Sequence, residues 1–66
     1  MERREYICED GNDYCIKQFV SFFEAKEYAL EDENVKVIFE YNTWLDNDGC
    51  VENAELIGAV WDRDEA

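Results

Sequence analysis

The stretch Asn34–Trp44, NVKVIFEYNTW, decides the fold of this chain. Its apolar and polar side chains alternate with a period of two, and it is rich in β-branched and aromatic residues. Both features are typical of a long β-strand with one face toward a core. The stretch 54–61, AELIGAVW, has the same character. The sequence therefore predicts two strands here, separated by a short connection.

The connection Asp46 to Gly49 predicts a four-residue turn, in which Gly49 supplies a positive φ. This turn makes one side of the hairpin apolar through its middle, as a buried face requires. It also places Glu40 directly opposite Glu55. The other facing pairs would be Leu45 with Cys50, Tyr41 with Ala54, Phe39 with Leu56, Val37 with Gly58 and Val35 with Val60.

The same stretch has a second interpretation, as a calcium loop. With Gly49 at the sixth place of the helix–loop–helix calcium pattern, Asp46, Asp48 and Glu55 take the third, fifth and twelfth places. However, Trp44 occupies the first place, which is normally an aspartate ligand, and the flanking segments read as strands. We favour the turn and keep a calcium-binding module as the weakest functional alternative.

The first half of the chain predicts a hairpin followed by a helix. Residues 5–19 contain two β-favouring runs around a cluster of turn-forming residues. A Gly11-Asn12 tip places Cys8 opposite Cys15, whereas an Asp10-Gly11 tip shifts the pairing. Ser21 and Glu24 then form a capping box, which marks the start of a helix. That helix should end near residue 31 or 32 and bury the face that carries Phe22, Ala25, Tyr28 and Ala29.

The predicted fold is a single α+β domain over residues 1–66, with the order strand, strand, helix, strand, strand. One helix can cover one face of a four-stranded antiparallel sheet. The order of the strands in the sheet does not follow from this pattern. The predicted core consists of Phe22, Ala25, Ala29, Val35, Val37, Phe39, Leu56 and Val60.

The residue types that carry most enzyme chemistry are scarce. The chain has no His, one Ser and one Thr, and no glycine-rich phosphate loop. Cys8, Cys15 and Cys50 leave open a zinc site completed by a carboxylate, or a Cys8–Cys15 disulfide, but free and partly buried thiols fit better. We therefore expect a protein that is not an enzyme and has no metal or cofactor.

The net charge of −12, from eighteen acidic and six basic residues, restricts the partners. It excludes simple electrostatic binding to nucleic acids and to anionic membranes, since both need cations on the protein. It favours basic protein surfaces, including those that bind nucleic acids. The N-terminal MERREYICED lacks an apolar signal region, no segment is long enough to span a membrane, and the cysteine count is odd, so we expect a cytoplasmic protein.

The candidate partner-binding residues form two groups. Acidic side chains at helical spacing should make a stripe on the outer side of the helix, and further acids should face each other in the second hairpin. The sheet face opposite the helix should carry exposed tryptophan and isoleucine side chains, a combination typical of contact sites. The residues are Glu24, Glu27, Glu31, Asp32, Glu40, Glu55, Trp44, Trp61, Ile38 and Ile57.

In size and charge the chain resembles small acidic inhibitors carried by bacteriophages and mobile elements, such as anti-CRISPR and anti-restriction proteins, some of which mimic nucleic acid. This resemblance rests on composition and length. It implies a non-catalytic protein that occupies a basic nucleic-acid-binding surface of a larger protein. The alternative is a structural homodimer, or a small subunit whose sheet face is buried in an assembly.

Overall fold

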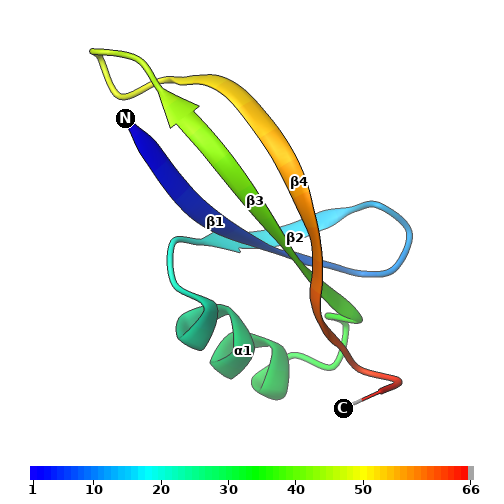
Figure 1. Ribbon diagram of the computed structural model, residues 1–66. Helices are drawn as coiled ribbons and strands as arrows, with labels where there is room; N and C mark the ends of the chain where they lie inside the picture. Colours follow the sequence, from blue (N-terminus) through cyan, green and yellow to red (C-terminus); the bar gives the residue numbers. More distant parts are fainter. Residues whose placement is uncertain (66) are drawn as a thin grey trace.

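A computed structural model describes residues 1–65 and contains four strands and one helix (Figure 1). In chain order they are β1 (Glu2–Glu9), β2 (Cys15–Phe19), α1 (Phe22–Glu31), β3 (Val37–Leu45) and β4 (Val51–Asp62). The predicted α+β class and the element order are confirmed.

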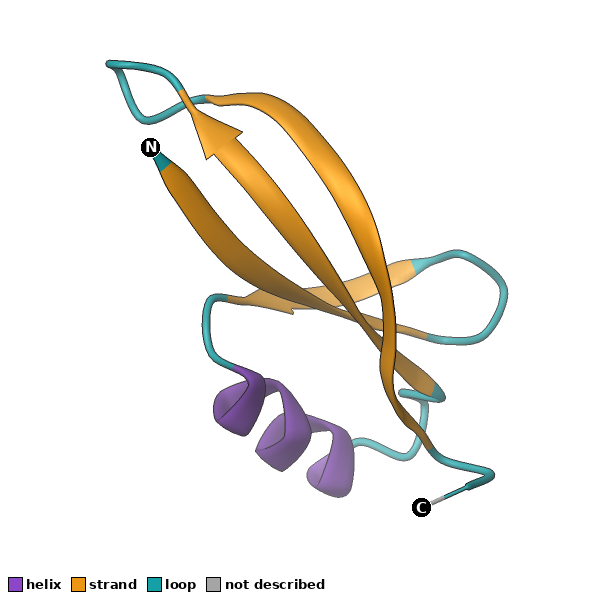
Figure 2. Cartoon of the chain, viewed as in Figure 1, coloured by secondary structure: helices purple, strands orange, loops and turns teal. Residues whose placement is uncertain are grey.

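The strands form one antiparallel sheet in the order β2-β1-β3-β4. The helix lies on one side of this sheet, mainly against β1 and β2 (Figure 2). β1, β3 and β4 extend well past the helix as a three-stranded arm, and the molecule measures 38 × 18 × 16 Å. The sheet is therefore covered by the helix over only part of its length.

The helix begins where the capping signal predicts. Ser21 has an extended backbone, and its Oγ accepts a hydrogen bond from the Glu24 backbone N–H at 3.4 Å. Ala25 and Ala29 are fully buried, and Phe22 and Tyr28 pack against the core. The predicted inner face of the helix is confirmed.

Arg63, which follows β4, donates hydrogen bonds to carbonyl groups at the C-terminal end of the helix. The last turn of α1 has no basic residue of its own. The Arg63 guanidinium donates from Nη2 to the carbonyl oxygens of Ala29 at 2.5 Å and Asp32 at 3.2 Å, and from Nε to that of Val35 at 2.7 Å. Carbonyls at a helix C-terminus have no partner within the helix, and a cation there also interacts favourably with the negative end of the helix dipole.

The core lies on the other face of β3 from the one predicted. Ile38 is fully buried with Cys8 beneath the helix, whereas Val37 and Phe39 are only half-buried. The reason is Val35. It is fully buried as predicted, but it precedes β3 and its N–H bonds to Asp32 O, so it does not share the alternation of the strand.

The predicted core is therefore wrong in β4 as well. Leu56 is 52% exposed and Val60 is 39% exposed, whereas Trp61 packs against the core. Ile38 pairs with Trp61 across the strands, so the two lie on the helix side of the sheet together. On the helix side of the sheet, the large side chains are therefore those of Ile38 and Trp61, each one residue along its strand from the residues that were expected there.

The register of the second hairpin differs from the prediction at the turn, where Leu45 pairs with Val51 rather than Cys50, and bulges then displace it further. Shifts occur between Ile38 and Phe39, between Glu40 and Tyr41, and between Trp44 and Leu45. Each shift adds an unpaired residue to β4 and displaces the pairs that follow. The observed pairs include Glu40 with Gly58, Asn42 with Glu55, Tyr41 with Leu56 and Leu45 with Val51. The predicted facing of Glu40 and Glu55 is wrong.

The first hairpin also has a different register. Cys8 pairs with Lys17, and a bulge separates this pair from the one between Glu9 and Cys15. The connection uses positive φ angles at Gly11 and Asp13 and is longer than either predicted tip. Neither tip accounts for this pairing.

No helix over residues 1–65 has the length and apolar character that crossing a membrane would need.

Candidate partner-binding surfaces

The eighteen acidic residues have two kinds of environment. In seven of them the carboxylate has a hydrogen-bond or ion-pair partner within the fold. Four aspartates, Asp10, Asp32, Asp46 and Asp62, accept bonds from backbone N–H groups in turns. Glu2, Glu5 and Glu40 are bonded or ion-paired to other side chains. These seven carboxylates have structural roles that explain their positions.

Eleven acidic residues remain, and ten of them are exposed. In residues 1–65 these ten carboxylates have no side-chain hydrogen bond and no ion pair. Three lie on α1, two lie on β4 and the others lie in loops. They are Asp13, Glu24, Glu27, Glu31, Glu33, Asp48, Glu52, Glu55, Asp64 and Glu65.

The basic residues do little to neutralise this surface. Arg3 pairs with Glu5 and Arg4 with Glu40, and these are the two salt bridges found over residues 1–65. Arg63 binds the helix carbonyls. Lys17 Nζ lies 5.6 Å from the ring centre of Phe19 and 5.4 Å from that of Tyr28, and Lys36 Nζ donates to Glu33 O at 2.8 Å.

The outer side of α1 carries the predicted acidic stripe. Glu24, Glu27 and Glu31 are all exposed, opposite the buried alanines. Beside them lie two large apolar side chains that the sequence analysis missed, Phe23 at 69% and Leu30 at 65% exposure. They are seven residues apart, so they share one side of the helix. The pair Phe22-Phe23 was the available signal, since adjacent helical side chains point about 100° apart and only Phe22 continues the spacing of the buried alanines.

The other predicted acids are placed differently. Asp32 is half-buried, and its carboxylate accepts from Tyr28 Oη and the Asn34 N–H. Glu40 accepts from Arg4 Nη1 and from Tyr6 Oη, both at 3.0 Å. Glu55 is exposed on β4, at the far edge of the sheet from the strands under α1. The helix stripe and Glu55 therefore belong to two separate surfaces.

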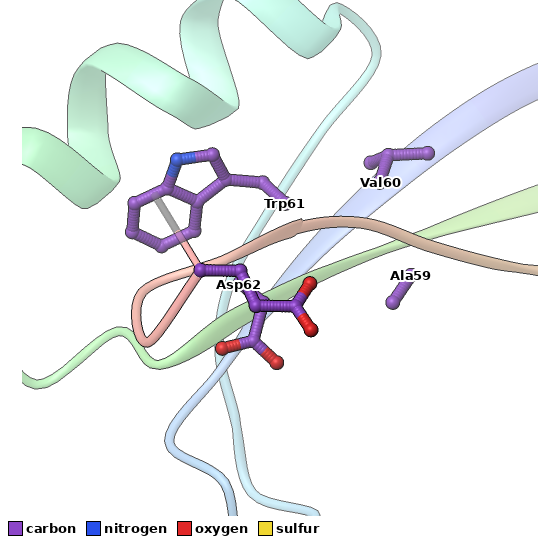
Figure 3. Close-up of a pocket in the computed structure, with 5 residues that line it drawn as sticks. Ala59, Val60, Trp61 and Asp62 are labelled. Atoms are coloured by element: carbon purple, nitrogen blue, oxygen red, sulfur yellow. The ribbon is translucent and has the colours of Figure 1, made fainter.

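The predicted tryptophan and isoleucine face does not exist as one surface. Ile38 is in the core, and the Trp61 indole extends from β4 toward α1 (Figure 3). The Arg63 guanidinium lies 5.1 Å from the centre of the Trp61 ring. Trp44 is half-buried on the arm, and Ile57 is 47% exposed on β4. Only Ile57 of these four is freely accessible.

Figure 3 shows an open hollow beside Trp61 that Ala59, Val60, Asp62 and Glu65 also line. Its volume is about 490 Å³. A second hollow of about 400 Å³ lies between the first loop and the end of α1, where Asp10 and Lys36 contribute to its lining. Neither hollow is lined by Glu5 or Glu9, the two buried carboxylates among residues 1–65.

The two buried carboxylates have opposite electrostatic environments. Burial raises the pKa of Glu5, but the hydrogen bond from Gln18 Nε2 at 2.6 Å and the charge of Arg3 outweigh it, so this pKa is lowered. Arg3 Nη2 lies 3.6 Å from Glu5 Oε2, which gives that oxygen a charge partner without a hydrogen bond. Burial raises the pKa of Glu9, and the nearby charges of Asp13 and Asp10 raise it further.

The cysteines and the loop at Asp46 have structural explanations. All three thiols are free, and burial raises the pKa of Cys8 to about 11. Asp46 Oδ1 accepts from the N–H groups of Asp48 and Cys50, and Gly49 has a φ of +82°. These bonds close the turn predicted there. In the part of the chain that the structure describes, no group of three acidic or cysteine side chains is arranged to hold a metal ion.

Comparison with known families, curated proteins and solved structures finds no match to this chain.

Proposed function

We propose that the protein is a non-catalytic binding protein that occupies a basic, nucleic-acid-binding surface of a larger protein. The observation that carries this proposal is the set of ten exposed carboxylates that have no side-chain partner across residues 1–65. A carboxylate that serves the fold is expected to be bonded within it, as the seven structural acids are. Unpaired acids in this number reduce stability through mutual repulsion, so a role outside the fold explains them better.

The acidic stripe on α1 has a charge spacing that suits a phosphate-binding groove. Glu24 to Glu31 spans seven residues, or roughly 10.5 Å at a rise of 1.5 Å per residue. The three carboxylates therefore give about one charge per 5 Å, against one per roughly 3.4 Å along each DNA strand. The stripe is less dense than a nucleic-acid strand but of the same order, which is sufficient to attract the arginines and lysines of such a groove.

Phe23 and Leu30 supply the apolar part of this proposed contact. Charge steers association, whereas a few desolvated apolar anchors usually supply most of the affinity. Ile38 is buried and Trp61 is half-buried with its ring packed against the core, so neither is as accessible as Phe23 and Leu30. The outer face of α1 combines both requirements, with two large exposed side chains next to three carboxylates.

By its size and charge we assign the protein to the class of inhibitors that bacteriophages and mobile elements use against host nucleic-acid enzymes. Such an inhibitor would act in the cytoplasm, as a stoichiometric competitor of DNA or RNA. It would need no catalytic group and no cofactor.

To test this, proteins that bind heparin are first collected from a bacterial lysate. They are then passed at low salt over the acidic protein immobilised on a resin, and a retained protein is taken as its target. Glu24→Gln/Glu27→Gln/Glu31→Gln is compared with Asp48→Asn/Asp64→Asn/Glu65→Gln, since both triple variants have a net charge of −12 + 3 = −9. We expect the helix variant to lose at least about tenfold in affinity for its target and the loop variant about twofold. Added DNA or RNA should displace the target. Binding that is insensitive to salt and to nucleic acid would refute the proposal.

A second candidate function is a homodimer or a small subunit of an assembly. The exposure of Phe23, Leu30 and the apolar side chains of β4 favours it. Sedimentation separates the two candidates by their response to salt. Self-association of a chain with a charge of −12 should strengthen as salt screens the repulsion, whereas binding to a basic partner should weaken.

A further inference from the structure

The strand β4 forms one complete edge of the sheet. It pairs with β3 on one side, and within residues 1–65 no strand pairs with its other side. At about 3.3 Å per residue its twelve residues extend for roughly 40 Å, close to the 38 Å length of the molecule. Figure 1 shows β4 running along the arm from the loop after β3 to the level of α1. Its outward N–H and C=O groups are a template for another strand.

The two edges of the sheet differ in their protection. The opposite edge, β2, has five residues and carries Lys17, and short charged edges resist pairing with other chains. β4 has no lysine, arginine or proline. Along it, Val51, Leu56, Ile57 and Val60 are 53%, 52%, 47% and 39% exposed. The charges of β4 are all acidic and three bulges interrupt it, so it resists other acidic chains but keeps apolar surface that a cationic strand could bury.

The bulges limit where a new strand would pair regularly. Glu52, Ile57 and Val60 are the residues that the register shifts leave unpaired. Between them, residues 53 to 56 pair with β3 without interruption. Within this run Asn53 and Glu55 lie on the helix side of the sheet and Ala54 and Leu56 on the other side, because strand side chains alternate. The run therefore has a polar, acidic face and an apolar face.

We propose that the free edge of β4, centred on residues 53 to 56, binds an extended segment of a partner protein in which basic and apolar side chains alternate. The basic side chains would lie beside Glu55 and the apolar ones beside Leu56. This inference rests on the proposed function, since it names the part of the basic partner that this edge accepts. Backbone bonds would supply affinity, and the alternation would supply specificity.

A second copy of the chain suits this edge poorly. β4 carries Glu52, Glu55 and Asp62 and no cation, so two copies paired through β4 would bring six carboxylates to one seam. Like charges across paired strands are destabilising. A cationic segment would instead be attracted by these acidic side chains.

The probe is a capped six-residue peptide of alternating lysine and valine, titrated into ¹⁵N-labelled protein. A capped peptide with the same composition, three lysines followed by three valines, is the control. We expect the alternating peptide to shift backbone amides of residues 53 to 57 and to bind at least about fivefold more tightly than the block peptide. Shifts confined to α1 or β2, equal binding of both peptides, or no shift at millimolar peptide would overturn the proposal.

Matched variants separate this edge from the general charge of the protein. Glu55→Lys and Glu27→Lys each replace one exposed acid with a lysine, the first on β4 and the second on α1. We expect about tenfold weaker peptide binding for the first and at most about twofold for the second. Leu56→Lys, which also places a lysine on the edge, should match the first variant. Equal effects of Glu55→Lys and Glu27→Lys would refute docking at β4.

The outcomes also distinguish this inference from the function on which it rests. If basic targets bind with salt and nucleic-acid sensitivity but Glu55→Lys and Leu56→Lys have no effect on them, the function stands and the β4 inference fails. If no basic protein binds at all, the proposed function fails. If sedimentation shows dimers that strengthen with salt and that Leu56→Lys abolishes, β4 binds a second copy and the inference is again wrong.

Discussion

Replacing Arg63 with alanine should destabilise the protein far more than a typical surface substitution, although Arg63 is partly exposed. The side chain donates three hydrogen bonds to carbonyls of residues 29, 32 and 35. It thereby ties the end of the chain after β4 to the end of α1, two segments about thirty residues apart in sequence. No basic residue in the last turn of α1 can take its place.

The size of the loss follows from these contacts. A hydrogen bond to a charged group contributes about 1.5–3 kcal/mol, so three give about 5–9 kcal/mol before water is considered. Because Arg63 is half-buried, water can reach part of the vacated space, and we expect about 2–4 kcal/mol to be lost. A domain of this length has a stability of roughly 3–10 kcal/mol. The predicted loss is therefore a large fraction of the total stability.

The assay is urea denaturation followed by far-UV circular dichroism. Lys26→Ala is the matched control, since both variants change the net charge from −12 to −13 and Lys26 is exposed on α1. Arg63→Lys should lose about half as much as Arg63→Ala, because an ammonium keeps the charge without the planar set of donors. If Arg63→Ala and Lys26→Ala agree within about 0.5 kcal/mol, which is the usual range for surface substitutions, the Arg63 hydrogen bonds do not stabilise the fold as argued.

Three further predictions concern buried groups. Ile38→Ala should cost about 2–4 kcal/mol and Leu56→Ala less than about 1 kcal/mol by urea denaturation, and the reverse order would contradict the assignment of the two sheet faces. Glu9→Gln should stabilise the protein at pH 7, because burial and the charges of Asp13 and Asp10 raise the pKa of Glu9. At pH values above the ordinary pKa of 4.5, the folded chain binds more protons than the unfolded chain, so the protein with Glu9 becomes less stable as pH rises. The gain in stability from Glu9→Gln should therefore vanish below pH 4.5. A thiol reagent at pH 8 should modify the exposed Cys15 and Cys50 in the native protein and reach Cys8 only on unfolding, since burial raises the pKa of Cys8 to about 11; equal rates for all three would argue against that burial.

Local signals in the sequence predicted local structure well. Ser21, Glu24 and the spacing of the two buried alanines depend on contacts within one or two helical turns, and the helix appeared where they indicate. The long alternating stretch likewise predicted β3. The fold class followed, since one amphipathic helix and four strands allow few compact arrangements.

The choice of sheet face depended on information that is not local. β3 carries apolar side chains on both faces, so alternation alone does not say which face the helix covers. The prediction took its phase from Val35, which proved to lie before the strand. Bulges then shifted both hairpin registers. Gly58, a glycine within a strand beside the unpaired Ile57, was a signal for one of them, and the others have no clear signal in residue type. The candidate site reflects this difference: the helix acids were placed correctly, whereas Ile38 and Trp61 were placed on the wrong face.

The acidic stripe of α1 allows one more test, which asks whether these charges serve the fold. Glu31 lies at the C-terminal end of the helix, where its charge opposes the dipole, and Glu27 lies nearby with no side-chain partner over residues 1–65. Glu24 lies in the first turn, where a carboxylate is favourable, so it is left unchanged. Glu27→Gln/Glu31→Gln should therefore stabilise the protein by about 0.5–1 kcal/mol at low salt, which corresponds to roughly 2–8 °C in Tm for a domain of this size. The gain should shrink as salt rises, because screening weakens the repulsion that the substitutions remove. If the double variant instead melts at a lower temperature, these acids stabilise the fold, and the argument that they are present for a partner loses its foundation.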